Sequence, residues 1–183
     1  ETFYVADAQN HAIRKITGGV VSTLAGNGSS GDVDGTGSSA RFYVPTGIDY
    51  HNGYVYVSDN GNHKIKRIDA ATGATTTLVG TGFAGTNDGP ALVARLYNPT
   101  EVRVASNGDV YISDYGNHSI RKLTGGIVST FAGLSGSSGD VLGTGTVARF
   151  NRPTGIAFGS GGFLFVADQV NCKIKAIDPN GTV

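Results

Sequence analysis

The sequence has few of the residues that cross-link small proteins or place them in a membrane. Of its 183 residues one is cysteine, none is methionine or tryptophan, and five are proline. Cys172 has no second cysteine in the chain, so an intrachain disulfide is excluded and the redox compartment stays open. No apolar run approaches the roughly 18 residues of a membrane-spanning helix, and we expect no membrane span.

Net charge is absent as well. Fourteen basic residues balance fourteen acidic ones, which disfavours a general electrostatic hold on nucleic acid or on an anionic membrane. The chain starts at Glu1 within an apolar stretch, with no methionine and no signal-peptide pattern. We therefore expect a processed or trimmed piece of a longer protein.

Glycine is the residue in excess, at 29 of 183 positions, against roughly 7% in average proteins. The glycines separate short apolar stretches, a pattern typical of a turn-rich β protein and not of a disordered tail.

Three sequence blocks recur with a period near 54 residues. The first, such as YVSDNGNHKIKRI at 56–68, ends a strand with an aspartate, and its four aspartates follow one another at intervals of 52, 55 and 54 residues. These aspartates are Asp7, Asp59, Asp114 and Asp168. The second block is ARFYVPTGI (40–48), ARLYNPTEV (94–102) and ARFNRPTGI (148–156), and the third is STLAG (22–26), TTLVG (76–80) and STFAG (129–133). Several short strands in a unit of this length predict a propeller blade.

One unit reads as four antiparallel strands, a to d. Strand a starts at the proline, where no ladder donor is lost, and the b–c turn is NGN or YGN, where glycine and asparagine tolerate positive φ. In strand c, Ile65 and Ile68 face opposite sides, which suits a sheet covered on both faces. The chain then reads bcd, abcd, abcd, abc, which is 14 strands or about three and a half blades. The predicted blades are approximately 1–26 (partial), 45–80, 99–133 and 153–183 (partial).

The pattern PTGI…YVSDNGNHKIKRI…TLVG resembles NHL-repeat β-propellers, and the connector AGNGSSGDVDGTGSSARFYVPTG resembles their long-loop variety. The resemblance covers residues 1–183 and implies an all-β fold of four-stranded antiparallel blades. NHL propellers are typically six-bladed, so it also implies that these blades are part of a six-bladed ring, completed by more of the same chain or by another polypeptide.

The b–c turn carries His11, His63 and His118 in three copies and Cys172 in the fourth. Such a set could ligate zinc, but equivalent positions lie far apart around a propeller axis. We therefore predict no metal site, and a structural role for each side chain at its own turn. The strand-end aspartates could line a channel, but we favour bonds to the turn's own N–H groups.

Three arginines recur in the second block, each followed by an apolar residue that we expect to fill the gap between blades. The arginines are Arg41, Arg95 and Arg149, and the apolar residues are Phe42, Leu96 and Phe150. An anion-binding ring is one interpretation of the arginines; a loop held by pairing, with Asp34 and Asp88 as partners, is the one we favour. GDVDG at 31–35 resembles a calcium loop but lacks a full set of oxygen ligands, so we predict a turn.

Nine of the fourteen basic residues lie on strand c. They are Arg14, Lys15, Lys64, Lys66, Arg67, Arg121, Lys122, Lys173 and Lys175. An RNA-binding NHL domain needs a continuous basic face with aromatic residues for stacking. Here the charges form one cluster per blade and acids balance them, so RNA binding is only a minor alternative.

Positions that differ between the copies are candidates for partner contact, because the blade itself does not require them; solvent-facing drift without a function is the alternative interpretation. Tyr43, Tyr97, Glu101 and Arg152 flank the repeated prolines, near one face by the axis. Asn-x-Ser/Thr sequons at Asn27, Asn117 and Asn180 are candidate N-glycosylation sites and give weak support for secretion.

We expect a non-catalytic scaffold without a cofactor that presents a rigid face to a protein or a glycan, within a larger extracellular or cell-surface protein. The main alternative follows from the resemblance, because amidating lyases and paraoxonase-like hydrolases carry a metal on the axis of a related propeller. Strand a supplies only Asp49 and Glu101 as carboxylates and no histidine, which disfavours that enzyme. A purely architectural role in a larger assembly is the third interpretation.

Overall fold

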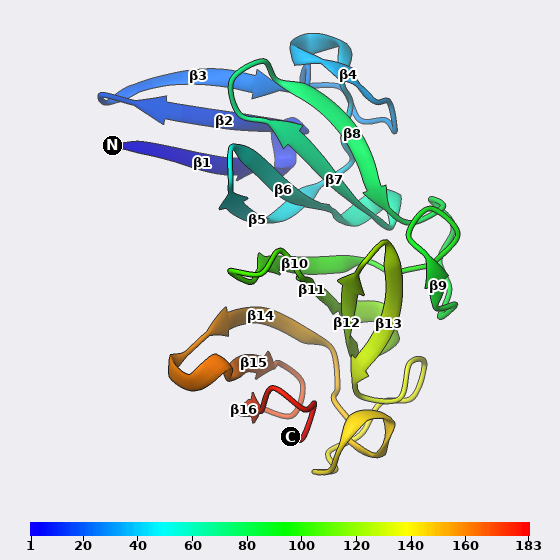
Figure 1. Cartoon of the computed structure of the whole chain (residues 1–183). Coiled ribbons are helices and arrows are strands. Elements are labelled where there is room, and N and C mark those ends of the chain that lie inside the picture. The colour runs from blue at the N-terminus through cyan, green and yellow to red at the C-terminus, as the bar shows by residue number, and fades with distance from the viewer.

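A computed structural model describes all residues 1–183. It contains four antiparallel sheets that follow one another along the chain, here called blades 1 to 4 (Figure 1). Blade 1 is β1 (Thr2–Asp7), β2 (Ala12–Thr17) and β3 (Val20–Ala25). Blade 2 is β5 (Pro45–His51), β6 (Tyr54–Asp59), β7 (Lys64–Asp69) and β8 (Ala74–Val79). Blade 3 is β10 (Pro99–Val104), β11 (Val110–Asp114), β12 (Ser119–Thr124) and β13 (Ile127–Ala132). Blade 4 is β14 (Pro153–Phe158), β15 (Leu164–Asp168) and β16 (Lys173–Ile177).

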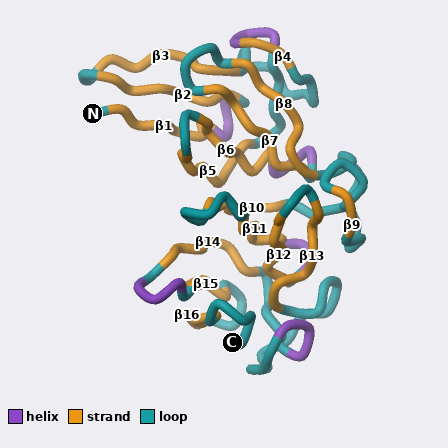
Figure 2. The backbone as a smooth tube through the Cα atoms, viewed as in Figure 1, coloured by secondary structure: helices purple, strands orange, loops and turns teal.

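The predicted strand order bcd, abcd, abcd, abc is confirmed. Two short outer strands were not predicted, β4 (Gly35–Thr36) beside β8 and β9 (Gly89–Pro90) beside β13. Each comes from a long connector and pairs through only two residues, too short for an alternation pattern to show. All remaining regular structure is single 3-10 turns (Figure 2), and no helix has the length and apolarity needed to cross a lipid bilayer.

The core lies between the sheets, in three clusters that each join consecutive blades. Ile65 and Ile68 are both fully buried, and they belong to the clusters on opposite faces of blade 2. This confirms that an interior blade is apolar on both faces because both are covered. The expected plugs are confirmed too: Phe42, Leu96 and Phe150 reach in from the connectors and are completely buried.

The a-strands lie side by side and define a common inner side. Strand β10 contacts both β5 and β14. The Thr46 hydroxyl donates to the Thr100 carbonyl at 3.0 Å, and the Thr100 hydroxyl donates to the Pro153 carbonyl at 3.3 Å. The repeated Pro-Thr dipeptide thus links each inner strand to the next.

Candidate functional site

Three of the four strand-end aspartates connect strand b to the segment before the proline of the same blade, whereas Asp7 accepts from the side chains of Asn10 and Arg14. Asp59 accepts the Tyr43 N–H at 2.7 Å with one carboxylate oxygen and the Asn62 side-chain amide at 2.8 Å with the other. Asp114 and Asp168 repeat this pattern in blades 3 and 4. These aspartates therefore act structurally, but their donors are not the turn's own backbone N–H groups. An asparagine recurs three residues after each aspartate, and this repeat was the sequence signal that could have predicted the side-chain donor.

Strand c places one cation beside each of these aspartates. Lys66, Arg121 and Lys175 occupy equivalent positions and are buried. Arg121 donates to Asp114 at 2.8 Å and also pairs with Asp88. Lys175 pairs with Asp168 at 2.8 Å and with Asp140 at 2.9 Å. Three of the nine basic residues on strand c are thus internal counter-ions and are lost to any basic surface.

The expected pairing of Arg41 with Asp34 and of Arg95 with Asp88 is wrong. Asp34 accepts from Lys66 at 3.2 Å and from the Thr77 backbone N–H at 2.8 Å. The buried cation of strand c competes successfully for these carboxylates because burial strengthens the attraction. The stem of Arg41 lies against Gly31, and that of Arg95 against Gly85.

The loop-holding role is observed for Arg149 through carbonyls and not through a carboxylate. Its guanidinium donates to the carbonyl oxygens of Thr146 at 2.6 Å, Val147 at 2.8 Å and Ala148 at 2.8 Å. Leu142 stands where the other connectors have Asp34 and Asp88, and in this connector Asp140 supplies the carboxylate that pairs with the buried Lys175.

Burial raises the pKa of both Asp59 and Asp114 to about 6, against the opposing effects of Lys66 and Arg121. Both carboxylates are therefore ionised at neutral pH. Because each then faces a buried cation, the charge inside the blade is compensated.

The histidines connect each blade to the next. The Nδ1 atoms of His11, His63 and His118 accept backbone N–H groups of the following blade at 3.2, 3.1 and 3.0 Å, respectively. The donors are Val44, Asn98 and Arg152. The predicted structural role of the histidines is observed, but each accepts its hydrogen bond from the following blade and not from its own turn. The imidazoles serve three separate junctions, and the chain has no group of three or more His, Cys, Asp or Glu side chains placed to hold a metal ion.

The positive φ in the b–c turn belongs to the histidine and not to glycine. His63 and His118 have φ of 57° and 58°, whereas Gly61 and Gly116 do not have positive φ. Glycine is required for space: a Cβ on Gly61 would lie 2.4 Å from the Tyr43 ring. The expectation that Gly61 serves the turn's dihedrals is therefore wrong.

Tyr43 and Tyr97, two of the predicted contact residues, lie over these glycines. Their rings also approach His11 and His63, with centroids 5.8 and 5.6 Å apart. In blade 4 the pair is Asn151 and Val170, so the larger side chain has changed sides. The residue at the tyrosine position therefore varies together with the b–c turn residue that it faces. Tyr43 and Tyr97 nevertheless remain 46% and 44% exposed.

The other two predicted contact residues have different partners. Arg152 is exposed, and its guanidinium stands 5.6 Å from the Tyr115 ring centroid. Glu101, on inner strand β10, accepts from Arg103 at 2.7 Å, and burial raises the pKa of the Glu101 carboxyl while Arg103 opposes the rise. None of these contacts joins Glu101 or Arg152 to Tyr43 or Tyr97.

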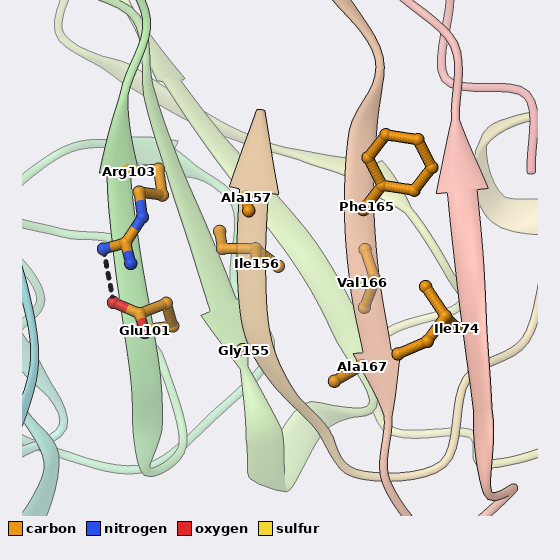
Figure 3. Close-up of a pocket in the computed structure, with 9 residues that line it drawn as sticks. All are labelled: Glu101, Arg103, Gly155, Ile156, Ala157, Phe165, Val166, Ala167 and Ile174. Carbon is orange, nitrogen blue, oxygen red and sulfur yellow. Dashed lines mark hydrogen bonds and ion pairs between the residues drawn. The ribbon is translucent and has the colours of Figure 1, made fainter. Parts of the chain in front are cut away.

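Glu101 and Arg103 line a cavity of about 270 Å³ beside blade 4. Figure 3 shows the Glu101–Arg103 pair on one strand, with Ile156, Phe165 and Ile174 on the strands beyond it. Six of the nine lining residues are hydrophobic, so the cavity offers one ion pair on an otherwise apolar wall.

Sequence reasoning missed a second cavity, of about 630 Å³, at the far ends of blades 3 and 4. Its lining includes Tyr111, Phe158 and the ion pair between Lys122 and Asp109, whose N–O distance is 2.8 Å. Turns from two blades form this cavity. The separation of these turns depends on the angle between the two sheets, which no local sequence pattern predicts.

The three sequons differ in access. Asn27 and Asn180 are exposed. Asn117 is buried, and its side-chain nitrogen donates to the Gly85 carbonyl at 2.6 Å and to Asp114 at 2.8 Å. A glycan on that nitrogen is incompatible with this fold, so Asn117 is removed from the candidate glycosylation sites.

The family model for the NHL repeat matches residues 96–123, which run from the plug Leu96 to the end of strand c in blade 3. The chain carries an NHL repeat in blade 3 and has the blade arrangement of a β-propeller. NHL repeat-containing protein 2 of Bos taurus is 35% identical over 133 residues, and the match covers 66% of this chain and 18% of that protein. Protein SUPPRESSOR OF QUENCHING 1, chloroplastic, of Arabidopsis thaliana is 36% identical over 133 residues, with 66% and 12% covered. This NHL chain thus spans less than a fifth of the length of these relatives.

A further relative of the NHL chain carries an enzyme's name. The probable peptidyl-alpha-hydroxyglycine alpha-amidating lyase pgal-1 of Caenorhabditis elegans is 35% identical over 84 residues, covering 45% of this chain and 23% of that protein. Among solved structures, a Bacteroides thetaiotaomicron protein of unknown function has a TM-score of 0.78 and 24% identity over 96% of this chain and 44% of its own. The structural likeness supports the fold alone.

Proposed function

We propose that this NHL propeller is a non-catalytic scaffold that binds a protein or a glycan on its exposed loops. The observation that carries the proposal is the state of its buried charges. All the buried carboxylates of blades 2 to 4 lie at the end of strand b and pair with the buried cations of strand c, which also pair with aspartates of the connectors. Catalytic groups need a perturbed pKa in a cavity that substrate can reach. The buried charged groups of this chain instead pair with one another and stabilise the blades.

The connectors supply the contact surface in this proposal. Phe83 is 70% exposed and Leu142 68% exposed, and both lie in the long connectors between blades. Exposed apolar and aromatic side chains on a rigid framework suit recognition, because little conformational entropy is lost on binding. The fold-level proposal is that the four blades belong to a six-bladed ring within a larger extracellular or cell-surface protein.

A matched set of variants tests the binding surface. The probes are a glycan array and cross-linking to proteins of the native extract, each with the full chain and with the double variant Tyr43→Ala/Tyr97→Ala. Tyr50→Ala is the control, because Tyr50 is at least as exposed as the two tyrosines but lies at the opposite end of β5. A ligand retained by the wild type and the control but lost by the double variant supports the proposal. Equal retention by all three overturns this placement of the surface.

One observation favours a second candidate, a propeller enzyme. Glu101 is partly buried, its pKa is raised by burial, and it lines a cavity with Arg103 beside the inner strands. The amidating-lyase relative makes a peptidyl-α-hydroxyglycine the substrate to try, with and without added Zn²⁺ or Ca²⁺. Product formation that Glu101→Gln abolishes would replace the scaffold by an enzyme. The scaffold predicts no product above the Glu101→Gln background.

A further inference from the structure

Each junction between blades has three equivalent positions at the hairpin end, which is the end of the sheets where the a–b and c–d turns lie. They are an aromatic residue of strand b, a cation of strand c and the residue five places after the proline of the next blade. In order along the chain these are Tyr4, Lys15 and Tyr50, then Tyr56, Arg67 and Val104, then Tyr111, Lys122 and Phe158. Of the three junctions, only the one between blades 3 and 4 leaves a cavity at this end, of about 630 Å³.

The length of the a–b turns accounts for part of this difference. The turn of blade 2 comprises only residues 52–53, whereas those of blades 3 and 4 run over 105–109 and 159–163. Figure 1 shows these two longer turns at the same end of their sheets. Both turns contribute to the lining, so the walls of the cavity extend beyond the sheets themselves.

Ring packing accounts for the rest. At the first junction the rings of Tyr4 and Tyr50 stack with their planes 16° apart. At the third junction Tyr111 and Phe158 meet edge to face, with centroids 5.4 Å apart and planes at 89°. Phe158 lines the cavity and remains 38% exposed, so an aromatic surface is available to a ligand there.

One fixed ion pair lies in the same wall. The Lys122 ammonium stands 2.8 Å from the Asp109 carboxylate and 5.2 Å from the Tyr111 ring centroid. The same carboxylate accepts the Thr124 hydroxyl at 2.8 Å and the Asn107 side-chain amide at 3.0 Å. Both charges are therefore held in place before a ligand arrives, which lowers the entropic cost of binding.

We propose that this cavity binds a neutral sugar, with one sugar ring stacked on Phe158. A carboxylate only accepts hydrogen bonds and an ammonium only donates them, whereas a hydroxyl does both. Neighbouring hydroxyls can therefore bond Asp109 and Lys122 together, while the C–H face of the sugar packs on the aromatic ring. The volume lies within the roughly 300–1,000 Å³ of small-ligand sites. Tyr43 and Tyr97 stand at the other end of the blades, so this site does not rest on the surface proposed above.

The same groups disfavour other ligands and a hydrolytic reaction. Asp109 and Lys122 compensate each other, so an ion of either sign gains one attraction and one repulsion. An organic cation would also need the Tyr111 ring, over which the Lys122 ammonium already lies. Asp109 is the only carboxylate in the lining, and glycoside cleavage uses a pair of them. The sugar is therefore bound and not cleaved.

Titration of the full chain with four disaccharides tests the proposal. Maltose, cellobiose, xylobiose and N,N′-diacetylchitobiose are added one at a time, and binding is followed through the amide NMR shifts of the two longer turns. We expect saturable binding of at least one of them. Phe158→Val copies Val104 of blade 3 and removes the ring, and Asp109→Asn removes the charged acceptor. Each should raise the Kd by about tenfold or more.

Two further variants separate the cavity from a general effect on the blade. Phe163→Ala is the matched control and should leave the Kd unchanged, because Phe163 is 40% exposed in the same turn of blade 4 but does not line the cavity. Ser106→Trp fills the cavity from an exposed turn position and removes none of the recognising groups. It should abolish binding, and it keeps the test decisive should Phe158→Val fail to fold.

The proposal is overturned if none of the four disaccharides binds saturably, or if Phe158→Val and Ser106→Trp leave the Kd unchanged. Tighter binding of choline or glucuronate than of every disaccharide also overturns it, because the ligand would then be an ion. The double variant Tyr43→Ala/Tyr97→Ala should bind the disaccharide as the wild type does. Loss of binding in that double variant alone overturns this site and supports the surface proposed above, so the two proposals fail separately.

Discussion

The two ends of the blades differ in how strictly they repeat. At the loop end, where b–c turns, pre-proline segments and connectors meet, the aspartate, the asparagine, the buried cation and the histidine recur with nearly the same geometry. At the hairpin end, where strands a–b and c–d turn, the equivalents diverge. Arg67 lies over Tyr54 in blade 2, whereas Lys122 pairs with Asp109 in blade 3.

This difference indicates which end holds the molecule together. At the loop end, buried charges hold the strands and connector of each blade together, and histidine–backbone bonds join each blade to the next. None of these groups can be exchanged singly, since its partner would be left buried and unpaired. The hairpin end uses contacts that lie closer to solvent and can vary from blade to blade. Stability should therefore be sensitive to substitution at the loop end and tolerant at the hairpin end.

The largest expected effect is at Asp114. Asp114→Asn leaves the fully buried Arg121 with Asp88 as its only carboxylate, and we expect a loss of about 3 kcal/mol in the free energy of unfolding. The matched change at the hairpin end is Asp49→Asn, where one carboxylate oxygen accepts the Val104 N–H and the expected loss is about 1 kcal/mol. Urea unfolding of the three proteins measures both. Equal losses would break the comparison between the two ends.

A double-mutant cycle sharpens the comparison at the b–c turn. A side chain at Gly116 would enter the Tyr97 ring, whose nearest atom lies 2.5 Å from the ideal Cβ, so Gly116→Val should cost about 2 kcal/mol. Adding Tyr97→Asn reproduces the Val170–Asn151 pair of blade 4 and should recover at least about 1 kcal/mol. Additive losses would show that the two positions vary independently.

Replacing either of two strand-b serines by alanine should stabilise the protein. The Oγ atoms of Ser58 and Ser113 are buried without a hydrogen-bond partner, and Ala6 and Ala167 occupy the equivalent positions in blades 1 and 4. Ser113→Ala should raise the free energy of unfolding by about 1 kcal/mol. Ser119→Ala is the control and should lower it, since its buried hydroxyl bonds Ser135 at 2.9 Å. A loss in Ser113→Ala would mean that its hydroxyl has a partner in solution.

The smallest expected effect is a pH dependence at the histidine junctions. Burial lowers the pKa of His63 below its ordinary value of 6.5, and the unprotonated Nδ1 is the atom that accepts from Asn98. A folded-state pKa below the unfolded one gives stability that is present above the unfolded pKa and lost as the pH falls through the folded pKa. The wild type should therefore lose more stability than His63→Asn between about pH 7.5 and about pH 5.5, measured by urea unfolding. His51→Asn at the hairpin end is the control and should follow the wild type.

Periodicity in the sequence was sufficient for the blades, because a strand's faces are set by alternation and its ends by proline, aspartate and glycine. It was insufficient for the junctions. That His63 bonds Asn98 in the next blade, or that Asp34 meets Lys66 and not Arg41, depends on contacts between segments more than 30 residues apart. The differences between the copies suggested that position 43 is free to vary, although the Tyr43 ring fits only because Gly61 below it has no side chain.

The sequence by itself determined an all-β chain of 14 blade strands, their order, and which aliphatic residues face two neighbours, because these properties follow from local alternation repeated four times. The tertiary structure alone decided which charges are buried together, which blade each histidine serves and which flank stays open. These depend on how closely successive sheets approach, and the same isoleucine is core at position 120 and surface at 174 because only the first has a blade beside it.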